Sequence, residues 1–209
     1  VGGHLNAYTS RENTLYFAKV MKENLALAVT LISDILQNST MQIDELIREK
    51  SVIIQEIAQT NDTPDDIIFD HFQENAYPNQ SMGRPILGSV ELVKRLAPET
   101  LMEYMTKFYC PSRIIVSAAG NVDHDQLLKL VKSSFSSFSK RSLVSRENAR
   151  YIGGVFAEKR PLDRVHLILG WKGISYLDQN FYPASALSTL LGGGMSSRLF
   201  QELRENRGL

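Results

Sequence analysis

The chain contains a single cysteine, Cys110, among its 209 residues. One thiol excludes an internal disulfide framework and is too few for a metal site built from thiolates. We therefore expect the protein to reside in a reducing compartment.

The sequence also lacks an excess of either charge and any long apolar run. It carries 23 Lys and Arg against 23 Asp and Glu, and the cations are scattered rather than clustered. This balance argues against a nucleic-acid partner. No apolar run approaches the roughly 18–20 residues that cross a bilayer, so we expect no membrane span. No signal peptide is recognisable, and the start at Val1 without Met and the end just after a helix indicate a chain cut from a longer one.

Periodicity predicts strands and helices in a repeated order. Alternating side chains predict strands at 4–10 and 14–20, followed by helices, the second of which begins near Thr40 as its N-cap. Thr63 and Pro64 predict the start of a further helix. The other expected strands cover 112–119, 151–159 and 165–171, and the other expected helices cover 98–109, 123–138, 183–191 and 196–206.

This grouping predicts an α+β fold, a layered sheet with helices packed on one face. Because the pattern restarts, we expect two related αβ units: residues 1–138, a polar linker at 139–150, and the start of a second unit at 151–209.

Glu49 and Glu56 are the most informative pair in the chain. Seven residues make about two helical turns, so both carboxylates lie on one face, roughly 10 Å apart along the axis. Both flank the apolar stripe of their helix, where a carboxylate can turn toward a buried cleft. The same spacing occurs at the border of ordinary amphipathic helices, so the pattern alone leaves both interpretations open.

A second candidate motif, His71-Phe-Gln-Glu74-Asn75, lacks a ligand. The inverted zincin pattern His-x-x-Glu-His needs a second histidine where Asn75 stands. We therefore interpret His71 as a histidine on a surface helix.

Five segments, spread in order along nearly the whole chain, carry a family resemblance. They are Gly2-Gly-His-Leu-Asn-Ala-Tyr-Thr-Ser-Arg-Glu12, Asp34-Ile-Leu-Gln-Asn-Ser-Thr40, Glu49-Lys-Ser-Val-Ile-Ile-Gln-Glu56, Gly83-Arg-Pro-Ile-Leu-Gly88 and Gly192-Gly-Gly-Met-Ser-Ser-Arg-Leu-Phe-Gln-Glu202. Together they resemble the pitrilysin/insulinase family of zinc metallopeptidases, most strongly the β subunit of mitochondrial processing peptidase and its bacterial relatives.

The resemblance implies a role for four residues. Glu56 matches the third zinc ligand of a His-His-Glu site, and Glu49 matches an acid that supports that site. Asn6 and Ala7 match the strand edge on which the family lays an extended peptide substrate. The resemblance thus implies a zinc-dependent processing endopeptidase, with the zinc held partly by residues outside this chain.

The family's His-x-x-Glu-His lies roughly twenty residues before the segment at which this chain starts, so we expect the isolated chain to be inactive. The alternative is a non-catalytic relative, a respiratory-complex core subunit or a substrate-recognition subunit. Expected partners are a peptide or protein substrate, the remainder of its own chain, and a second copy or paired subunit. The bacterial cytoplasm is the expected location, with the mitochondrial matrix as the alternative.

Overall fold

The computed structural model describes residues 1–136, 138 and 148–209. Contacts within the chain divide it into two compact units, Val1–Ile168 and Leu169–Leu209. The division falls after Ile168 because residues 148–168 contact helix α3 (Pro64–Ala76) of the first unit. Most of the linker expected at 139–150 lies outside the described residues, and the repeat of two αβ units remains a prediction.

The first unit begins with an antiparallel hairpin of β1 (His4–Thr9) and β2 (Thr14–Lys19). His4 lies opposite Lys19 and Ala7 opposite Tyr16, and this pair forms a two-stranded sheet. The Ser10 amide donates to the Asn13 carbonyl at 2.8 Å and closes the turn. Both predicted strands are therefore confirmed.

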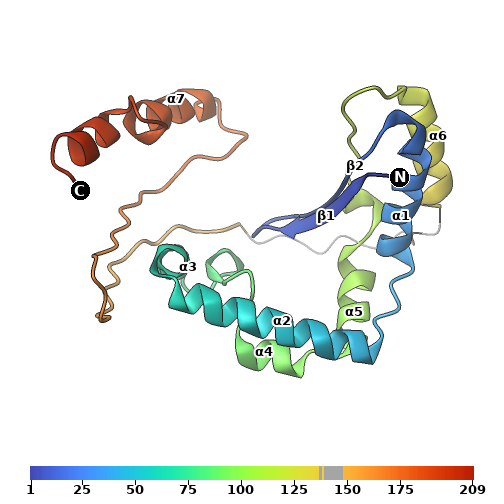
Figure 1. Ribbon diagram of the computed structural model, residues 1–209, viewed down its shortest axis with the longest axis horizontal. Coiled ribbons are helices and arrows are strands. Elements are labelled where there is room, and N and C mark those ends of the chain that lie inside the picture. The colour runs from blue at the N-terminus through green and yellow to red at the C-terminus, as the bar shows by residue number, and fades with distance from the viewer. Residues whose placement is uncertain (137, 139–147) are drawn as a thin grey trace. The chain divides into compact units, whose positions relative to one another are not determined.

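Helices make up most of the remaining secondary structure (Figure 1). Local sequence explains several of their starts: a proline occupies the first turn of α3 and of α5 (Pro98–Phe108), and Asp123 accepts the Gln126 amide at 2.8 Å to cap α6 (His124–Ser134). The other helices are α1 (Leu25–Gln37), α2 (Ile43–Asp62), α4 (Val90–Arg95), α5 (Pro98–Phe108), α6 (His124–Ser134) and α7 (Phe181–Gly192), with short turns η1 (Lys22–Asn24), η2 (Ser81–Gly83), η3 (Pro111–Arg113) and the π-helical η4 (Phe200–Glu205).

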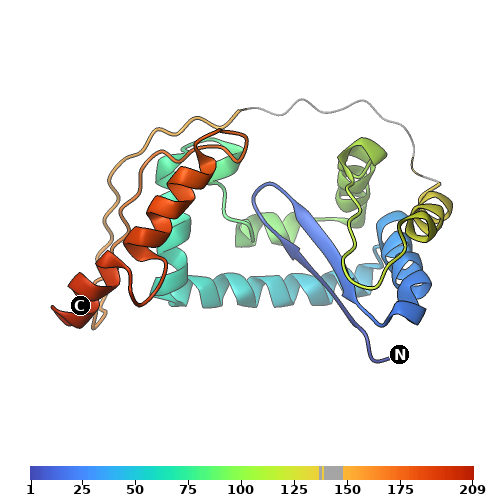
Figure 2. The same ribbon diagram turned by 90° about the horizontal axis from the view of Figure 1, so that it is seen from above.

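Two groups of helices pack within the first unit (Figures 1 and 2). Helix α1 packs against α6, and Gln37 donates to the Ser134 carbonyl at 2.8 Å between them. Helix α2 packs against α3 and α4. Among the described residues the buried apolar side chains are Ala28, Val29 and Leu36 on α1, Ile57 on α2, Ala76 on α3, Val93 on α4, and Cys110.

The α+β class is confirmed, but three predicted strands are wrong. Residues 112–119, 151–159 and 165–171 form no strand in the part of the chain that is described. Their β-branched side chains are open to solvent, as for Ile115, Val155 and Val165, which are each more than nine-tenths exposed. A β-branched sequence favours extended backbone, but a strand also needs a neighbour that accepts its hydrogen bonds.

The predicted N-cap at Thr40 is also wrong. Met41 adopts a left-handed backbone with φ of 48°, and helix α2 starts only after Gln42. Asp44 and Glu45 then occupy the first turn, where carboxylates interact favourably with the helix dipole.

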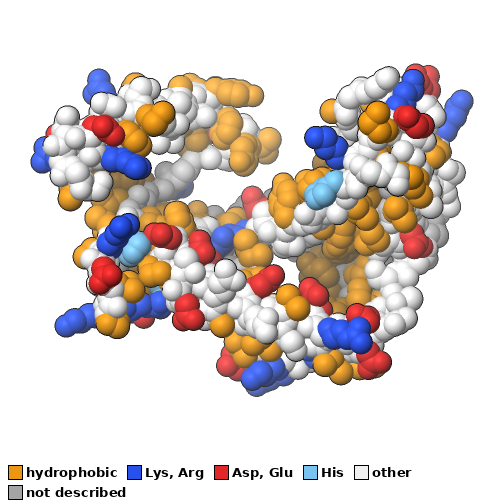
Figure 3. Space-filling view, viewed as in Figure 1, with side chains coloured by type: hydrophobic (Ala, Val, Ile, Leu, Met, Phe, Trp, Pro, Cys, Tyr) orange, Lys and Arg blue, Asp and Glu red, His pale blue; other side chains and the backbone are white. Residues whose placement is uncertain are grey.

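The surface agrees with the balanced composition. On the face seen in Figure 3, acidic and basic side chains alternate without an extended area of one sign. No helix among the described residues combines the length and the apolar character that a membrane span requires.

Tyr16 on β2 and Tyr109, which follows α5, join their hydroxyls at 3.1 Å. Burial raises the pKa of Tyr109 to about 12, and the hydrogen bond with Tyr16 adds to the shift. A phenol buried in this way holds its proton more tightly in the folded than in the unfolded chain.

We predict that this tyrosine pair makes stability sensitive to alkaline pH. The contribution from Tyr109 is complete below its unfolded pKa of about 10 and is lost as pH rises toward 12. Spectrophotometric titration should show one phenol that ionises last. Tyr16→Phe should lower that final pKa without returning it to the ordinary value, because burial remains. An unchanged titration curve in Tyr16→Phe would contradict the assignment.

We predict that Gly83→Ala destabilises the first unit. A Cβ at buried Gly83 would lie 2.2 Å from the Tyr77 carbonyl oxygen, and backbone cannot easily move aside. The expected cost is about 1–3 kcal/mol, measured by denaturant unfolding. Gly173→Ala is the control, since a Cβ there meets nothing within 4 Å. Equal stability of the two variants would contradict this prediction.

Candidate functional site

Helix α2 carries both candidate acidic residues on one continuous stretch. It runs unbroken from Ile43 to Asp62, so Glu49 and Glu56 share one face as their spacing predicted. Both glutamates are exposed, whereas the neighbouring Ile57 is buried, at 7% exposure. The helix therefore presents both carboxylates to solvent, and its apolar side is buried only at Ile57, since Ile43 and Ile47 are 53% and 54% exposed.

These carboxylates do not form a complete metal site with other described residues. In the described ranges no group of three or more His, Cys, Asp or Glu side chains is placed to hold a metal ion. A catalytic zinc takes three protein ligands and keeps one position open. The described residues therefore supply at most part of such a site.

Asn6 and Ala7 lie on β1, away from the α2 glutamates in sequence. Strand β1 pairs with β2 on one side only, within the described sheet, so its other side is an edge. The Ala7 amide donates to the Asn6 Oδ1 atom at 2.8 Å. The side chain of Asn6 thus satisfies a backbone donor of this strand, and a peptide bound at that amide would displace it.

Arg11 anchors the turn of the hairpin. Its Nη2 atom donates to Asp70 Oδ1 at 2.9 Å, and its Nε atom donates to the Met82 carbonyl at 3.2 Å. The two charged side chains are only 20% and 29% exposed. Sequence reasoning missed this contact, because 59 residues separate the two and no local pattern links them.

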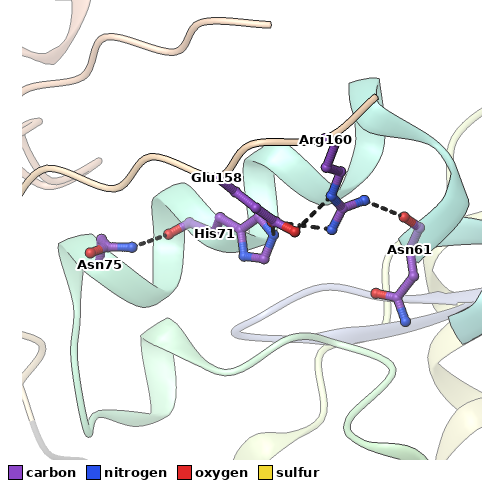
Figure 4. A network of polar contacts seen from close by, with 5 residues as sticks. All are labelled: Asn61, His71, Asn75, Glu158 and Arg160. Carbon is purple, nitrogen blue, oxygen red and sulfur yellow. Dashed lines mark hydrogen bonds and ion pairs between the residues drawn. The ribbon is translucent and has the colours of Figure 1, made fainter. Parts of the chain in front are cut away.

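His71 lies in a polar network rather than on an open helix surface (Figure 4). Its ring stacks on Phe156 with centroids 4.4 Å apart, and its Nε2 atom lies 3.2 Å from Glu158 Oε2. That atom is buried and makes no hydrogen bond of good geometry. His71 thus lies on a helix as expected, with a side chain that is 23% exposed and packed against residues 148–168.

Arg160 completes this network. Its Nε atom donates to Glu158 at 2.8 Å, and its Nη1 atom donates to the Asn61 carbonyl at the end of α2 at 2.7 Å. The hydrogen bond from Arg160 is the main reason that the pKa of Glu158 lies below its ordinary value. Residues 148–168 are further held by the Ile152 amide, which donates to the Ala76 carbonyl at 2.9 Å.

A cavity of about 380 Å³ lies between the end of α2, helix α3 and the loop before α4. Ile57 and Ile67 line its apolar part, and Asp70, His71 and Glu74 line its polar part. None of the four residues singled out from the sequence, Glu49, Glu56, Asn6 and Ala7, lines it. The candidate metal ligand and the cavity therefore share α2 but not a surface.

Two family models match the chain in succession. Residues 1–90 match the model described as insulinase, peptidase family M16, and residues 95–209 match the peptidase M16 inactive domain. An uncharacterized zinc protease from Rickettsia felis is 40% identical over 210 residues, which cover 100% of this chain and 51% of the relative. The chain thus spans about half the length of the curated relatives it matches.

Solved structures share the fold. The crystal structure of a protease from Helicobacter pylori superposes with a TM-score of 0.83 at 23% identity, covering 100% of this chain and 52% of that one. A chain of complex III2 from Candida albicans gives a TM-score of 0.61 at 22% identity, covering 73% and 37%. At these identities the likeness shows the fold alone.

We predict that Arg160→Gln loosens the attachment of residues 148–168 to the end of α2. The substitution removes the donors to Glu158 and Asn61, so limited proteolysis within this segment should become several-fold faster. Arg207→Gln is the matched control, because Arg207 pairs with Glu202 within the same short stretch of the second unit. Equal cleavage rates in both variants would contradict the prediction.

Proposed function

The chain belongs to peptidase family M16, the insulinase family, and from this premise we propose that the whole protein is a zinc-dependent endopeptidase of the processing type. The observation that supports it most is the pair of exposed carboxylates, Glu49 and Glu56, on one face of α2. The similarity to an uncharacterized zinc protease from Rickettsia felis supports the zinc-protease part of this proposal.

We propose Glu56 as the carboxylate ligand of the zinc ion. A carboxylate oxygen is an ordinary zinc ligand, and its exposure on a rigid helix leaves it free to bind. Glu49, one helical repeat earlier, supports the site from beside it, where a second carboxylate orients ligands and raises their basicity. We propose that the remaining two ligands, both histidines, come from a part of the whole protein outside this chain.

When bound, zinc polarises a carbonyl and lowers the pKa of water. The residues of this chain contribute binding and orientation. The free edge of β1 at Asn6 and Ala7 accepts an extended peptide through main-chain hydrogen bonds. Such bonds do not read side chains, so the proposed substrate class is extended polypeptide rather than one sequence.

The alternative is a non-catalytic relative, a core or substrate-recognition subunit of a larger assembly. The likeness to a complex III2 chain shows that the fold also occurs in such an assembly. The presence of both Glu49 and Glu56 favours the peptidase, because a non-catalytic subunit does not need two carboxylates at a zinc site. Zinc content and peptide cleavage of the whole protein distinguish the two.

We predict that Glu56→Gln in the whole protein removes bound zinc and peptide cleavage, because a neutral amide is a poor zinc ligand. Glu49→Gln should weaken zinc binding by about 10- to 100-fold, as for other residues that support ligands. Metal analysis after dialysis and turnover of an unstructured peptide are the measurements. Asp44→Asn is the control, since it lies on the same helix about 120° away from Glu56.

The 209-residue chain by itself should hold no stoichiometric zinc and cleave no peptide. Zinc retained in Glu56→Gln would exclude this residue as a ligand. Stoichiometric zinc with turnover in the 209-residue chain would contradict the proposal that ligands are supplied from elsewhere.

A further inference from the structure

The proposed function assigns binding and metal ligation to different elements. The peptide lies along β1, and the metal ligand Glu56 comes from α2. An edge that must be ordered when the peptide binds lowers the affinity for that peptide, so a β1 edge already held in register with Glu56 binds it more tightly.

The turn of the hairpin is the point at which β1 is held. Arg11 lies two residues beyond the end of β1 and four beyond Ala7, about 13 Å along an extended chain. The Ser10 amide and the Asn13 carbonyl close the turn at 2.8 Å, so a movement of Arg11 moves the end of the strand with it.

Both partners of Arg11 belong to the α3 side of the unit. Asp70 lies on α3 and Met82 in η2, and these two elements contact one another. Helix α3 also packs against α2, where Ile57 is buried directly after Glu56. A continuous series of contacts therefore runs from the hairpin turn through α3 to the candidate metal ligand.

The chemistry of the contact suits positioning. A guanidinium that donates through both Nε and Nη2 has a fixed plane, whereas a single ammonium does not. Because the pair is mostly shielded from solvent, salt screens it less than an exposed pair. A further long-range side-chain hydrogen bond of the hairpin, between Tyr16 and Tyr109, leads to the residue after α5 instead.

We infer that Arg11 is a positioning residue, which through Asp70 and the Met82 carbonyl holds the peptide-binding edge of β1 in register with Glu56. The inference rests on the proposed function, because it concerns the substrate edge and the metal ligand of that activity. It adds a residue that touches neither substrate nor metal.

The test compares Arg11→Gln, Arg11→Lys and Asp70→Asn in the whole protein, with KM, kcat and zinc content measured on an unstructured peptide. Loss of a charge-assisted bond predicts a KM about tenfold higher in Arg11→Gln, with zinc content unchanged. Arg11→Lys and Asp70→Asn should lie between this variant and the wild type, since each retains one partner of the bond. Arg48→Gln, which removes an exposed pair with Glu45, is the control and should keep the wild-type KM.

A purely structural role would give another result. Partial unfolding reduces the active fraction and hence the apparent kcat, but it leaves the KM of the folded molecules unchanged. If Arg11→Gln does not fold, the KM of Asp70→Asn tests the inference instead. This variant should fold, because the amide oxygen of the introduced asparagine would still accept a hydrogen bond from the Arg11 guanidinium. A wild-type KM in every folded variant overturns the inference alone. A wild-type whole protein that binds zinc but cleaves no peptide overturns the proposed function and the inference with it.

Discussion

The packing of α2 against α3 and α4 is the interaction on which the candidate site depends. One helical step of about 100° separates Ile57, which is buried, from Glu56, which is exposed. The packing that orients the isoleucine therefore also orients the carboxylate. Helix α3 then carries Asp70 and His71, to which the hairpin turn and residues 148–168 are attached.

Little apolar surface supports this arrangement. In the described part of the chain only single residues on α2, α3 and α4 are buried, at Ile57, Ala76 and Val93. Polar contacts over long sequence separation do much of the remaining joining, and arginine is the donor in two of them. Arg11 joins the hairpin to α3, and Arg160 joins residues 148–168 to the end of α2.

Local sequence predicted the elements whose cause is local. The hairpin follows from alternation, α1 from helical spacing, and α3 from the proline in its first turn. The start of α2 was misplaced because the left-handed conformation occurs at Met41, a residue type that does not predict it, rather than at a glycine. The strands expected near Ile115, Val155 and Val165 were wrong because pairing depends on a partner elsewhere in the chain, whereas β propensity reports only local fit.

The same distinction applies to the site. Two carboxylates seven residues apart on a helix can be placed from periodicity, and the structure puts Glu49 and Glu56 on one face. Arg11 and Asp70 are 59 residues apart in the sequence, so no periodic pattern predicts their contact. Both residues look like ordinary surface charges until the fold brings them together.

A hydrophobic contact and an arginine bridge constrain two elements differently. Apolar packing is nearly non-directional, so a helix with one buried isoleucine keeps some freedom to slide or rotate against its neighbour. A guanidinium with two acceptors in different elements fixes direction as well as distance. Arg11 has its acceptors in α3 and η2, and Arg160 has its acceptors in residue Glu158 and in α2. Apolar packing thus brings α2 and α3 together, and the two arginines set how the edge strand and residues 148–168 are placed upon them.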